Sequence, residues 1–442
     1  MPSYLSINKR IDSFNKKIIV SGDKSLSIRW VLLASQAIGK SRAYNLLMSE
    51  DVIAALEAIK KLGIKVLIKK KYCEILGKGL NNFTYENGLI IDAKNSGTLG
   101  RLILGLLIKS TKKIKLIGDK SLSKRDFSRV TEPLKKFGAK FQYKVKNKLP
   151  LSIIGSNNSK DIYYVENKGS AQCKSSVMLA ALNSSGTTYI KAKKSRNHTE
   201  LLFKYLKVPI KIKRTKKYDF INIIKPKKIN AFNYNIPGDI SSSAFFMVLT
   251  ILSKNSKLLI KNININPSRI GAITILKRMG AKILLKNKRN YKGEKISDIL
   301  IRSSKNLKGI NCPSELNSSA IDEFLIIFIA AAKAKGISYF KDISELNQKE
   351  SPRLNLGSKI LNMMGVKTEL TESSIKIYGQ PNLKITKKIV IKNYLKDHRI
   401  FMMSVIAALT CGGTWKIFDK DSINTSFPSF LKLIKKINNK AI

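Results

Sequence analysis

The chain has 442 residues, of which 43% are hydrophobic, and its 83 Lys and Arg against 29 Asp and Glu give a formal net charge of +54. This apolar content excludes general disorder, and the length indicates two or three domains. The longest apolar runs, such as 324–332, are too short to span a bilayer, which takes about 20 residues. Because the chain starts without the pattern of a secretion signal, we expect a cytoplasmic protein that is not bound to a membrane.

The excess of lysine is compatible with three interpretations. It is typical of nucleic-acid binders, it can draw anionic metabolites to a site, and it accompanies abundant Asn and Ile in AT-rich genomes. The lysines are scattered along the whole chain, which favours composition as the cause. The aromatic residues, 8% of the chain, are dispersed and not interleaved with the lysines, so we expect no nucleic-acid partner.

One amphipathic helix recurs along the chain with a similar ending. Each clear copy ends at a glycine, which suits a helix end because it adopts the left-handed conformation, and a short strand follows. The period is about 74 residues, one sixth of the chain, so the sequence predicts six repeated units. The endings lie at Gly63, Gly138, Gly280 and Gly365, with degenerate copies near Val208 and Asn438.

A second helix recurs at the same period. It is polar at its start and then apolar on every face, as a buried helix is. Its six predicted starts are Lys24–Ser25, Asn95–Ser96, Ser170–Gln172, Ser241–Ser243, Asp322–Glu323 and Asp397–His398.

Six units of this kind predict an α/β protein of the α+β type with two globular domains. The turns Ser21–Ser25 and Pro237–Ser241 resemble each other, and we interpret them as two crossovers between the domains. We therefore expect one discontinuous domain, residues 1–20 plus 240–442, and a second domain, residues 21–239.

The starts of the buried helices carry cations as well as helix caps. Unpaired N–H groups and the helix dipole make such starts natural anion sites. Ser, Asn and Asp can also act there as caps alone, but a cap needs no guanidinium, whereas a phosphate matches its planar shape. With no Walker loop and no dinucleotide fingerprint, the pattern favours a cleft for a pair of anionic substrates. The cations are Lys24, Arg29, Arg101 and Arg399, with further cationic turns at Gly118–Arg125, Ser195–His198 and Lys349–Arg353.

Many short motifs resemble those of one enzyme family, and they occur in the family's order. The chain resembles the 3-phosphoshikimate 1-carboxyvinyltransferase (enolpyruvylshikimate-phosphate synthase) family along nearly its whole length. Ser170-Ala171-Gln172, Gly293-Glu294 and Thr425 are similar to the class II branch. The motifs are Gly22–Ser27, Asn95–Thr98, Ser170–Gln172, Pro237–Asp239, Ile321–Glu323, Lys349–Ser351, Asp397–Ile400 and Thr425–Pro428.

This resemblance implies a fold, a reaction and a set of partners. The fold is two domains, each of three βαβαββ-type units with buried parallel helices, and the active site lies in the cleft between the domains. The reaction transfers the enolpyruvyl group of phosphoenolpyruvate to the 5-hydroxyl of shikimate 3-phosphate and releases phosphate. It needs no metal or organic cofactor. The resemblance also implies a monomer, inhibition by glyphosate in competition with phosphoenolpyruvate, and closure of the two halves when both substrates bind.

The resemblance assigns roles to individual residues. Asp322 is the base toward the 5-hydroxyl, Glu350 is the acid toward C3 of phosphoenolpyruvate, and Lys24 is also catalytic. Shikimate 3-phosphate is bound by Lys24, Ser25, Arg29, Ser170, Gln172, Ser195, Arg196, Asp322 and Lys349. Phosphoenolpyruvate is bound by Lys24, Gly97, Arg125, Gln172, Arg353 and Arg399. His398 is expected to support Arg399 and not to transfer a proton.

The chain departs from the family pattern at Ser21, Ile28, Leu325, Asn347 and Pro352. Asn347 and Pro352 flank Glu350, so they affect the assignment there most. A catalytically inactive relative therefore stays open as an alternative, and so does an RNA-processing protein, because an RNA-end cyclase has related repeats.

A third alternative is the sister transferase that acts on UDP-N-acetylglucosamine. That enzyme uses a cysteine on a mobile loop, and the corresponding segment, Gly118–Arg125, has none. The cysteines Cys73, Cys173, Cys312 and Cys411 form no CxxC pair, so we expect reduced thiols and no structural zinc, and we assign Cys173 to the core.

Overall fold

The computed structural model describes residues 3–439, which form two compact units. Unit 1 consists of Met1–Ser21, Pro237–Asn290 and Lys295–Ile442, and unit 2 of Gly22–Ile236 and Tyr291–Glu294. The expected division changed domain after residues 20 and 239, whereas the chain changes unit after Ser21 and after Ile236. The short segment Tyr291–Glu294, which we assigned to the other domain, belongs with unit 2.

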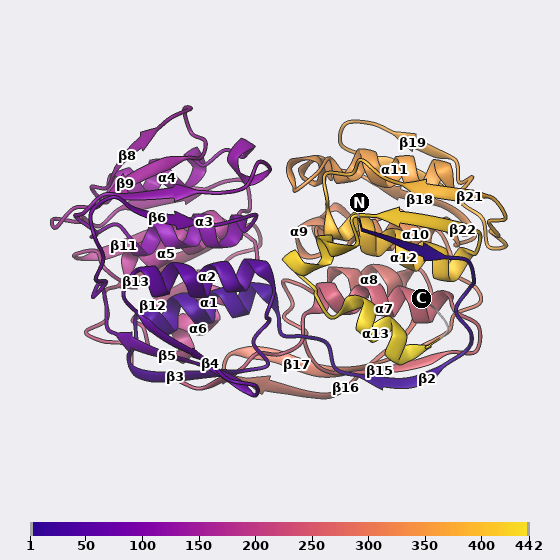
Figure 1. Cartoon of the computed structure of the whole chain (residues 1–442), viewed down its shortest axis with the longest axis horizontal. Helices are drawn as coiled ribbons and strands as arrows, with labels where there is room; N and C mark the ends of the chain where they lie inside the picture. The colour runs from indigo at the N-terminus through magenta and orange to yellow at the C-terminus, as the bar shows by residue number, and fades with distance from the viewer. Residues whose placement is uncertain (1–2, 440–442) are drawn as a thin grey trace. The chain divides into compact units, whose positions relative to one another are not determined.

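Each unit contains helices of two kinds, one buried and one amphipathic, and Figure 1 labels these helices within the two units. In unit 2 the buried helices are α1 (Lys24–Ser35), α3 (Gly97–Leu106) and α5 (Ala171–Ala181), and the amphipathic ones are α2 (Glu50–Lys61), α4 (Ser128–Lys136) and α6 (His198–Tyr205). In unit 1 the buried helices are α7 (Ile240–Leu252), α10 (Phe324–Ala332) and α12 (His398–Cys411), and the amphipathic ones are α8 (Gly271–Arg278), α11 (Arg353–Met363) and α13 (Phe430–Ile437). Four 3-10 turns and the short helix α9 complete the set: Leu122–Lys124, Ser314–Leu316, Asn317–Ala320 (α9), Ser344–Gln348 and Lys420–Thr425.

The strands of the described residues form six small sheets, three in each unit. A full sheet has a parallel pair of strands followed by two antiparallel neighbours, which is the pattern expected of a βαβαββ repeat. In unit 2 the sheets are β14 (Tyr234–Asn235)-β3 (Ile38–Tyr44)-β5 (Tyr72–Lys78)-β4 (Lys65–Ile68), β6 (Leu89–Asp92)-β7 (Ile114–Ile117)-β9 (Leu151–Ile154)-β8 (Lys140–Tyr143), and β10 (Tyr163–Glu166)-β11 (Thr187–Lys193)-β13 (Tyr218–Ile224)-β12 (Ile210–Arg214). In unit 1 they are β16 (Lys282–Tyr291)-β17 (Glu294–Arg302)-β15 (Lys257–Asn264)-β2 (Asn15–Ile18), β18 (Gly336–Phe340)-β20 (Ile375–Gly379)-β19 (Thr368–Leu370), and β21 (Lys388–Ile391)-β22 (Thr414–Phe418)-β1 (Tyr4–Ile7).

Three strands pair far from their neighbours in sequence. Strand β2 precedes α1 of unit 2, yet it pairs in parallel with β15 of unit 1, with Ile18 opposite Ile260. Strand β14 precedes α7 of unit 1, yet it pairs with β3 of unit 2, with Asn235 opposite Tyr44. Strand β1 pairs with β22 and supplies the third strand of the last sheet.

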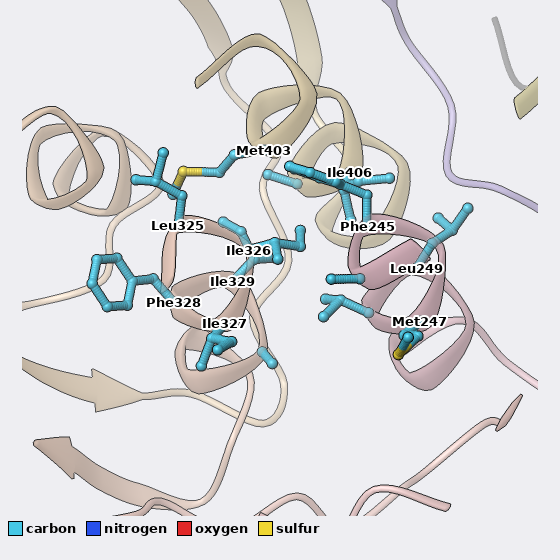
Figure 2. Packing of buried hydrophobic residues seen from close by; sticks show 14 of the residues in the cluster. Phe245, Met247, Leu249, Leu325, Ile326, Ile327, Phe328, Ile329, Met403 and Ile406 are labelled. Carbon is cyan, nitrogen blue, oxygen red and sulfur yellow. The ribbon is translucent and has the colours of Figure 1, made fainter. Parts of the chain in front are cut away.

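Apolar packing among the buried helices forms one core in each unit. Figure 2 shows part of the unit 1 core, where side chains of α7, α10 and α12 pack together, among them Phe245, Ile326 and Ile406. Every residue of α10 is buried, which explains why this helix is apolar on all its faces. In unit 2, α3 and α5 lie so close that a Cβ at Gly105 would be 2.1 Å from the carbonyl oxygen of Ser176.

The predicted helix ends are largely confirmed in the described residues. Gly63, Gly138, Gly280 and Gly365 all have φ between +79° and +101°. At the end of α6 the left-handed position is taken by Lys207, with φ of 57°, where the sequence pattern has no glycine. The degenerate copy predicted to end near Asn438 is confirmed as well, because α13 ends at Ile437 with Asn438 as its C-cap residue, here in an extended conformation with φ of −151°.

The predicted starts of α7 and α10 also differ from the structure, and α3 begins one residue later than predicted, at Gly97. Helix α7 begins at Ile240 and is capped by Asp239, whose carboxylate accepts hydrogen bonds from Ser241 N and Ser242 N. Helix α10 begins at Phe324, so Asp322 lies in a turn between α9 and α10 and is not a cap. No pattern in the sequence predicted the short helix α9 (Asn317–Ala320). Among residues 3–439, none of the helices combines the length and apolar content that a membrane crossing requires.

Candidate active site

The candidate residues of unit 1 gather around the guanidinium of Arg353, the first residue of α11. Its Nε and Nη2 donate hydrogen bonds to the two carboxylate oxygens of Asp397, over 2.9 and 3.2 Å. Nη2 also lies 2.5 Å from Glu350 Oε2, and Nη1 lies 3.7 Å from Asp322 Oδ1. One buried arginine thus contacts both predicted proton-transfer residues.

Burial and charge act in opposite directions on this group. Burial of Arg353 and Asp397 disfavours their charged forms, but each is the counter-ion of the other. Burial lowers the pKa of Arg353, but the carboxylates of Asp397 and Glu350 raise it by more, so the pKa of Arg353 lies above its ordinary value. Although burial opposes it, the Arg353 guanidinium holds the pKa of Asp397 below its ordinary value. The pair is therefore ionised at neutral pH.

Arg399, in the first turn of α12, joins this group through Asp322. Its Nη1 donates a hydrogen bond to the main-chain carbonyl of Asp322 over 2.7 Å, and its N–H donates to Asp397 Oδ1 over 2.9 Å. His398 Nδ1 lies 3.2 Å from the hydroxyl of Thr425. Asp322 is thus held from its backbone, and its carboxylate is 17% exposed.

Two departures from the family pattern lie at the start of α11 and have a structural role. Asn347 Oδ1 accepts hydrogen bonds from the N–H groups of Leu354 and Asn355, over 3.0 and 3.4 Å. Pro352 occupies the N-cap position of this helix. Asn347 therefore caps the helix that begins with Arg353.

Lys349, a predicted ligand of shikimate 3-phosphate, lies just before this helix. Its Nζ is 3.6 Å from Oε1 of Glu345.

In unit 2, the first residues of α1 include two of the predicted substrate ligands. Lys24 Nζ lies 2.8 Å from the carboxylate of Asp51, at the start of α2, and remains 20% exposed. The guanidinium of Arg29 is 4% exposed and donates to the Ser25 carbonyl, the Thr199 hydroxyl and the Ser175 hydroxyl, over 2.8–3.0 Å. Arg29 thus fixes the backbone at Ser25.

The starts of α3 and α5 lie together in unit 2. Gln172 accepts a hydrogen bond from Arg101 Nη1 over 2.9 Å and donates one to the Thr98 hydroxyl over 3.0 Å. A Cβ added at Gly97 would lie 2.8 Å from Arg101 Nη1 and 3.0 Å from Arg125 Nη1. Gly97, Gln172 and the two guanidinium groups therefore form one cationic cluster at these helix starts.

The remaining predicted ligands lie at the starts of α5 and α6. Ser170 caps α5, since its hydroxyl accepts from Cys173 N over 3.3 Å. Ser195 and Arg196 precede α6 and are half-buried. Within residues 3–439, Ser195 Oγ is buried and has no hydrogen-bond partner, so this hydroxyl has unused hydrogen-bonding capacity.

The four cysteines are buried free thiols. Cys173 lies within α5, and burial raises its pKa, which is the opposite of what activates a nucleophilic thiol. Burial also raises the pKa of Cys73 and Cys312 to about 11. These thiols do not have the character of the loop cysteine of the sister transferase.

Sequence reasoning missed three residues that contact the predicted ligands: Asp51, Asp397 as a partner of Arg353, and Arg101 as a partner of Gln172. The sequence pattern places Asp397 and Arg101 only at helix starts, and Asp51 follows the predicted start at Lys24 by about a third of a unit. The repeat was the one feature of the sequence that could have indicated that these helix starts lie close together.

Comparisons with known proteins agree on one family. Residues 9–434 match the sequence model of EPSP synthase (3-phosphoshikimate 1-carboxyvinyltransferase). The 3-phosphoshikimate 1-carboxyvinyltransferase of Ruthia magnifica subsp. Calyptogena magnifica is 41% identical over 97% of each chain, and that of Bacillus subtilis (strain 168) is 34% identical over 98% of this chain and 99% of its own. A solved structure of EPSP synthase from Acinetobacter baumannii, 34% identical, matches with a TM-score of 0.86 over 98% of this chain and 97% of its own. The chain therefore belongs to the EPSP synthase (3-phosphoshikimate 1-carboxyvinyltransferase) family.

Proposed function

We propose that this chain transfers the enolpyruvyl group of phosphoenolpyruvate to the 5-hydroxyl of shikimate 3-phosphate and releases phosphate, a step of the shikimate pathway to chorismate and the aromatic amino acids. Membership of the family supports the reaction. The observation that carries the residue assignment is the contact of Arg353 with both Asp322 and Glu350.

The reaction needs two carboxyl groups in different roles. Asp322 takes the proton of the 5-hydroxyl as that oxygen bonds to C2 of phosphoenolpyruvate, and Glu350 delivers a proton to C3. C3 then returns a proton to the Glu350 carboxylate as the C–O bond to phosphate breaks, and the departing phosphate takes up the proton that Asp322 had accepted. Proton transfer of this kind contributes about 10²- to 10⁴-fold to a rate.

Arg353 links the binding of phosphoenolpyruvate to the protonation of Glu350. In the structure the guanidinium contacts Glu350, which favours the carboxylate form over the acid. An anionic group of phosphoenolpyruvate that binds Arg353 competes for the same N–H donors. Release of Glu350 from this contact leaves it able to take up the proton that it delivers to C3.

The remaining cations bind and stabilise phosphate and carboxylate groups. Lys24, Gly97, Arg125, Gln172, Arg353 and Arg399 bind phosphoenolpyruvate, and the cations among them stabilise charge on the departing phosphate. Lys24, Ser25, Arg29, Ser170, Gln172, Ser195, Arg196, Asp322 and Lys349 bind shikimate 3-phosphate. We further propose that glyphosate competes with phosphoenolpyruvate, and that the enzyme acts as a monomer in the cytoplasm.

Phosphate release from the two substrates tests this proposal. We expect release only when both are present, and a loss of at least about 100-fold in Asp322→Ala and in Glu350→Gln. Glu369→Gln is the matched control, because this carboxylate forms an exposed ion pair with Lys376 in the same unit. No release from folded wild-type protein would overturn the reaction, and unchanged release in Glu350→Gln would overturn only its role.

A further inference from the structure

The first turn of α6 is held by buried polar contacts at each of its first three residues. His198, Thr199 and Glu200 are all buried, although a helix start on a protein surface normally leaves such side chains in water. We propose that this turn is fixed in order to present Ser195 and Arg196, and that Glu294 is the positioning residue that holds it. The inference rests on the proposed assignment of Ser195 and Arg196 to shikimate 3-phosphate.

Glu294 reaches α6 from the turn between β16 and β17. His198 Nδ1 lies 2.6 Å from Glu294 Oε1, and the two side chains are fully buried. This short contact fixes the orientation of the imidazole ring. Glu294 is one of the four residues of this hairpin that belong with unit 2.

The hairpin turn is shaped to lie along α6. Lys292 and Gly293 both have positive φ, 48° and 88°, as a tight turn of the hairpin type requires. A Cβ at Gly293 would lie 3.1 Å from the carbonyl oxygen of Leu201, so the backbone of the turn approaches the helix closely. Lys292 Nζ lies 5.2 Å from the ring centre of Tyr205, the last residue of α6.

Thr199 and Glu200, the second and third residues of α6, are held by contacts with α1 and α5. The Thr199 hydroxyl receives a hydrogen bond from Arg29 and lies 2.7 Å from the Ser175 hydroxyl. Glu200 pairs with Lys174 of α5 at 2.6 Å, and both side chains are buried. Arg29 is itself a proposed ligand of shikimate 3-phosphate. The first turn of α6 therefore has its position set by α1, by α5 and by the hairpin.

The first turn of α6 positions the segment directly before the helix. Asn197 is the N-cap residue of α6, and Ser195 and Arg196 precede it. Within the described residues, the buried hydroxyl of Ser195 has no hydrogen-bond partner, which indicates a place for a ligand oxygen. Loss of Glu294 removes the 2.6 Å contact that holds His198 Nδ1, and the first turn of α6 then shifts together with Ser195 and Arg196.

Steady-state kinetics of Glu294→Ala, with each substrate varied in turn, tests this role. We expect the KM for shikimate 3-phosphate to rise about tenfold, while kcat and the KM for phosphoenolpyruvate change less than about twofold. Glu294→Gln retains an acceptor oxygen and should keep most of the wild-type KM. His198→Ala should match Glu294→Ala, and the double variant should be no worse than either, because the two side chains act as one contact.

Two further variants separate this inference from the proposed function. Lys292→Met alters the hairpin turn between β16 and β17 but leaves the contact of Glu294 with His198 in place. It should leave the KM for shikimate 3-phosphate unchanged. Arg196→Ala should raise that KM strongly. If Arg196→Ala has no effect, the assignment of the ligand is wrong.

The inference is overturned if Arg196→Ala raises the KM and Glu294→Ala does not. It is also overturned if Glu294→Ala lowers kcat and weakens both substrates alike, since that is the result of general loss of structure. If Glu294→Ala does not fold, Glu294→Asp decides, because the shorter side chain loses the 2.6 Å contact and should raise the KM for shikimate 3-phosphate alone.

Discussion

Arg353 and Asp397 lie 44 positions apart in the chain and meet through two hydrogen bonds, with both side chains almost completely buried. The same carboxylate accepts from Arg399 N and from the Ser351 hydroxyl. Asp397 therefore joins the start of α11 to the start of α12. It also fixes Arg353 in the orientation that brings Nη1 and Nη2 to Asp322 and Glu350.

We predict that Arg353→Lys lowers activity by at least about 100-fold and lowers the free energy of unfolding by about 2 kcal/mol. A lysine carries the charge but cannot make the paired hydrogen bonds to Asp397. Arg353→Ala should cost more, about 3–5 kcal/mol, because it leaves a buried carboxylate uncompensated. Phosphate release and urea denaturation measure the two effects, with Arg302→Lys on an exposed position as the control. Wild-type activity in Arg353→Lys would contradict the proposed role of the guanidinium.

The stability of the protein should fall steeply in acid because of Asp397. Its pKa is held below the ordinary value despite burial, so its contribution to stability is present above the unfolded-state pKa, near 4, and is lost as the pH falls through the lower folded-state value. We predict that Asp397→Asn destabilises the protein at pH 7 and shows a weaker fall in stability below pH 4. Urea denaturation at a series of pH values measures this. Parallel curves for wild type and variant would show that Asp397 does not cause the dependence.

We predict that Gly97→Ala raises the KM for phosphoenolpyruvate and weakens inhibition by glyphosate. The added Cβ would press on the guanidinium groups of Arg101 and Arg125, at 2.8 and 3.0 Å, and displace them from the start of α3. Gly100→Ala is the control in the same helix, since its Cβ would meet Ala93 and Phe127 at an ordinary 3.5 Å. It should leave both constants unchanged and stabilise the helix by up to about 1 kcal/mol. Equal effects of the two substitutions would refute the steric explanation.

We predict that Asn347→Ala lowers the free energy of unfolding by about 1 kcal/mol, because α11 loses the cap on Leu354 N and Asn355 N. Asn347→Asp retains an acceptor oxygen and should be nearly neutral. Thermal unfolding compares the three proteins. If alanine and aspartate behave alike, the cap contributes nothing, and this departure from the family pattern has no explanation in the helix start.

Local patterns in the sequence predicted the repeat, and the two similar turns placed residues 1–20 with the C-terminal half, but no pattern predicted which strands pair. Glycine at a helix end and a helix apolar on every face are signals carried by a few neighbouring residues, so positions such as Gly63 and Gly280 were found. The pairing of β2 with β15 and of β14 with β3 depends on segments more than 190 residues apart, and neither strand has a sequence feature that names its partner.

The candidate site shows the same limit. The individual ligands came from the resemblance, residue by residue, and the contact of Glu350 with Arg353 joins residues only three positions apart on the chain. The contact of Arg353 with Asp397, and that of Glu294 with His198, join residues of different repeats. Glu294 had been noticed only as a mark of one branch of the family.

Strands β1 and β2 each pair with a strand made much later, β22 and β15, and this delays the assembly of unit 1 on the ribosome. Residues 15–18 must wait for their partners at 257–260, which at a translation rate of about 5–20 residues per second takes roughly ten to fifty seconds. Residues 4–7 wait longer still, for 415–418. Nearly all of unit 2 emerges in that interval. Newly made chains therefore carry two unpaired strands beside a nearly complete unit 2, and unpaired strand edges are templates for pairing with another chain.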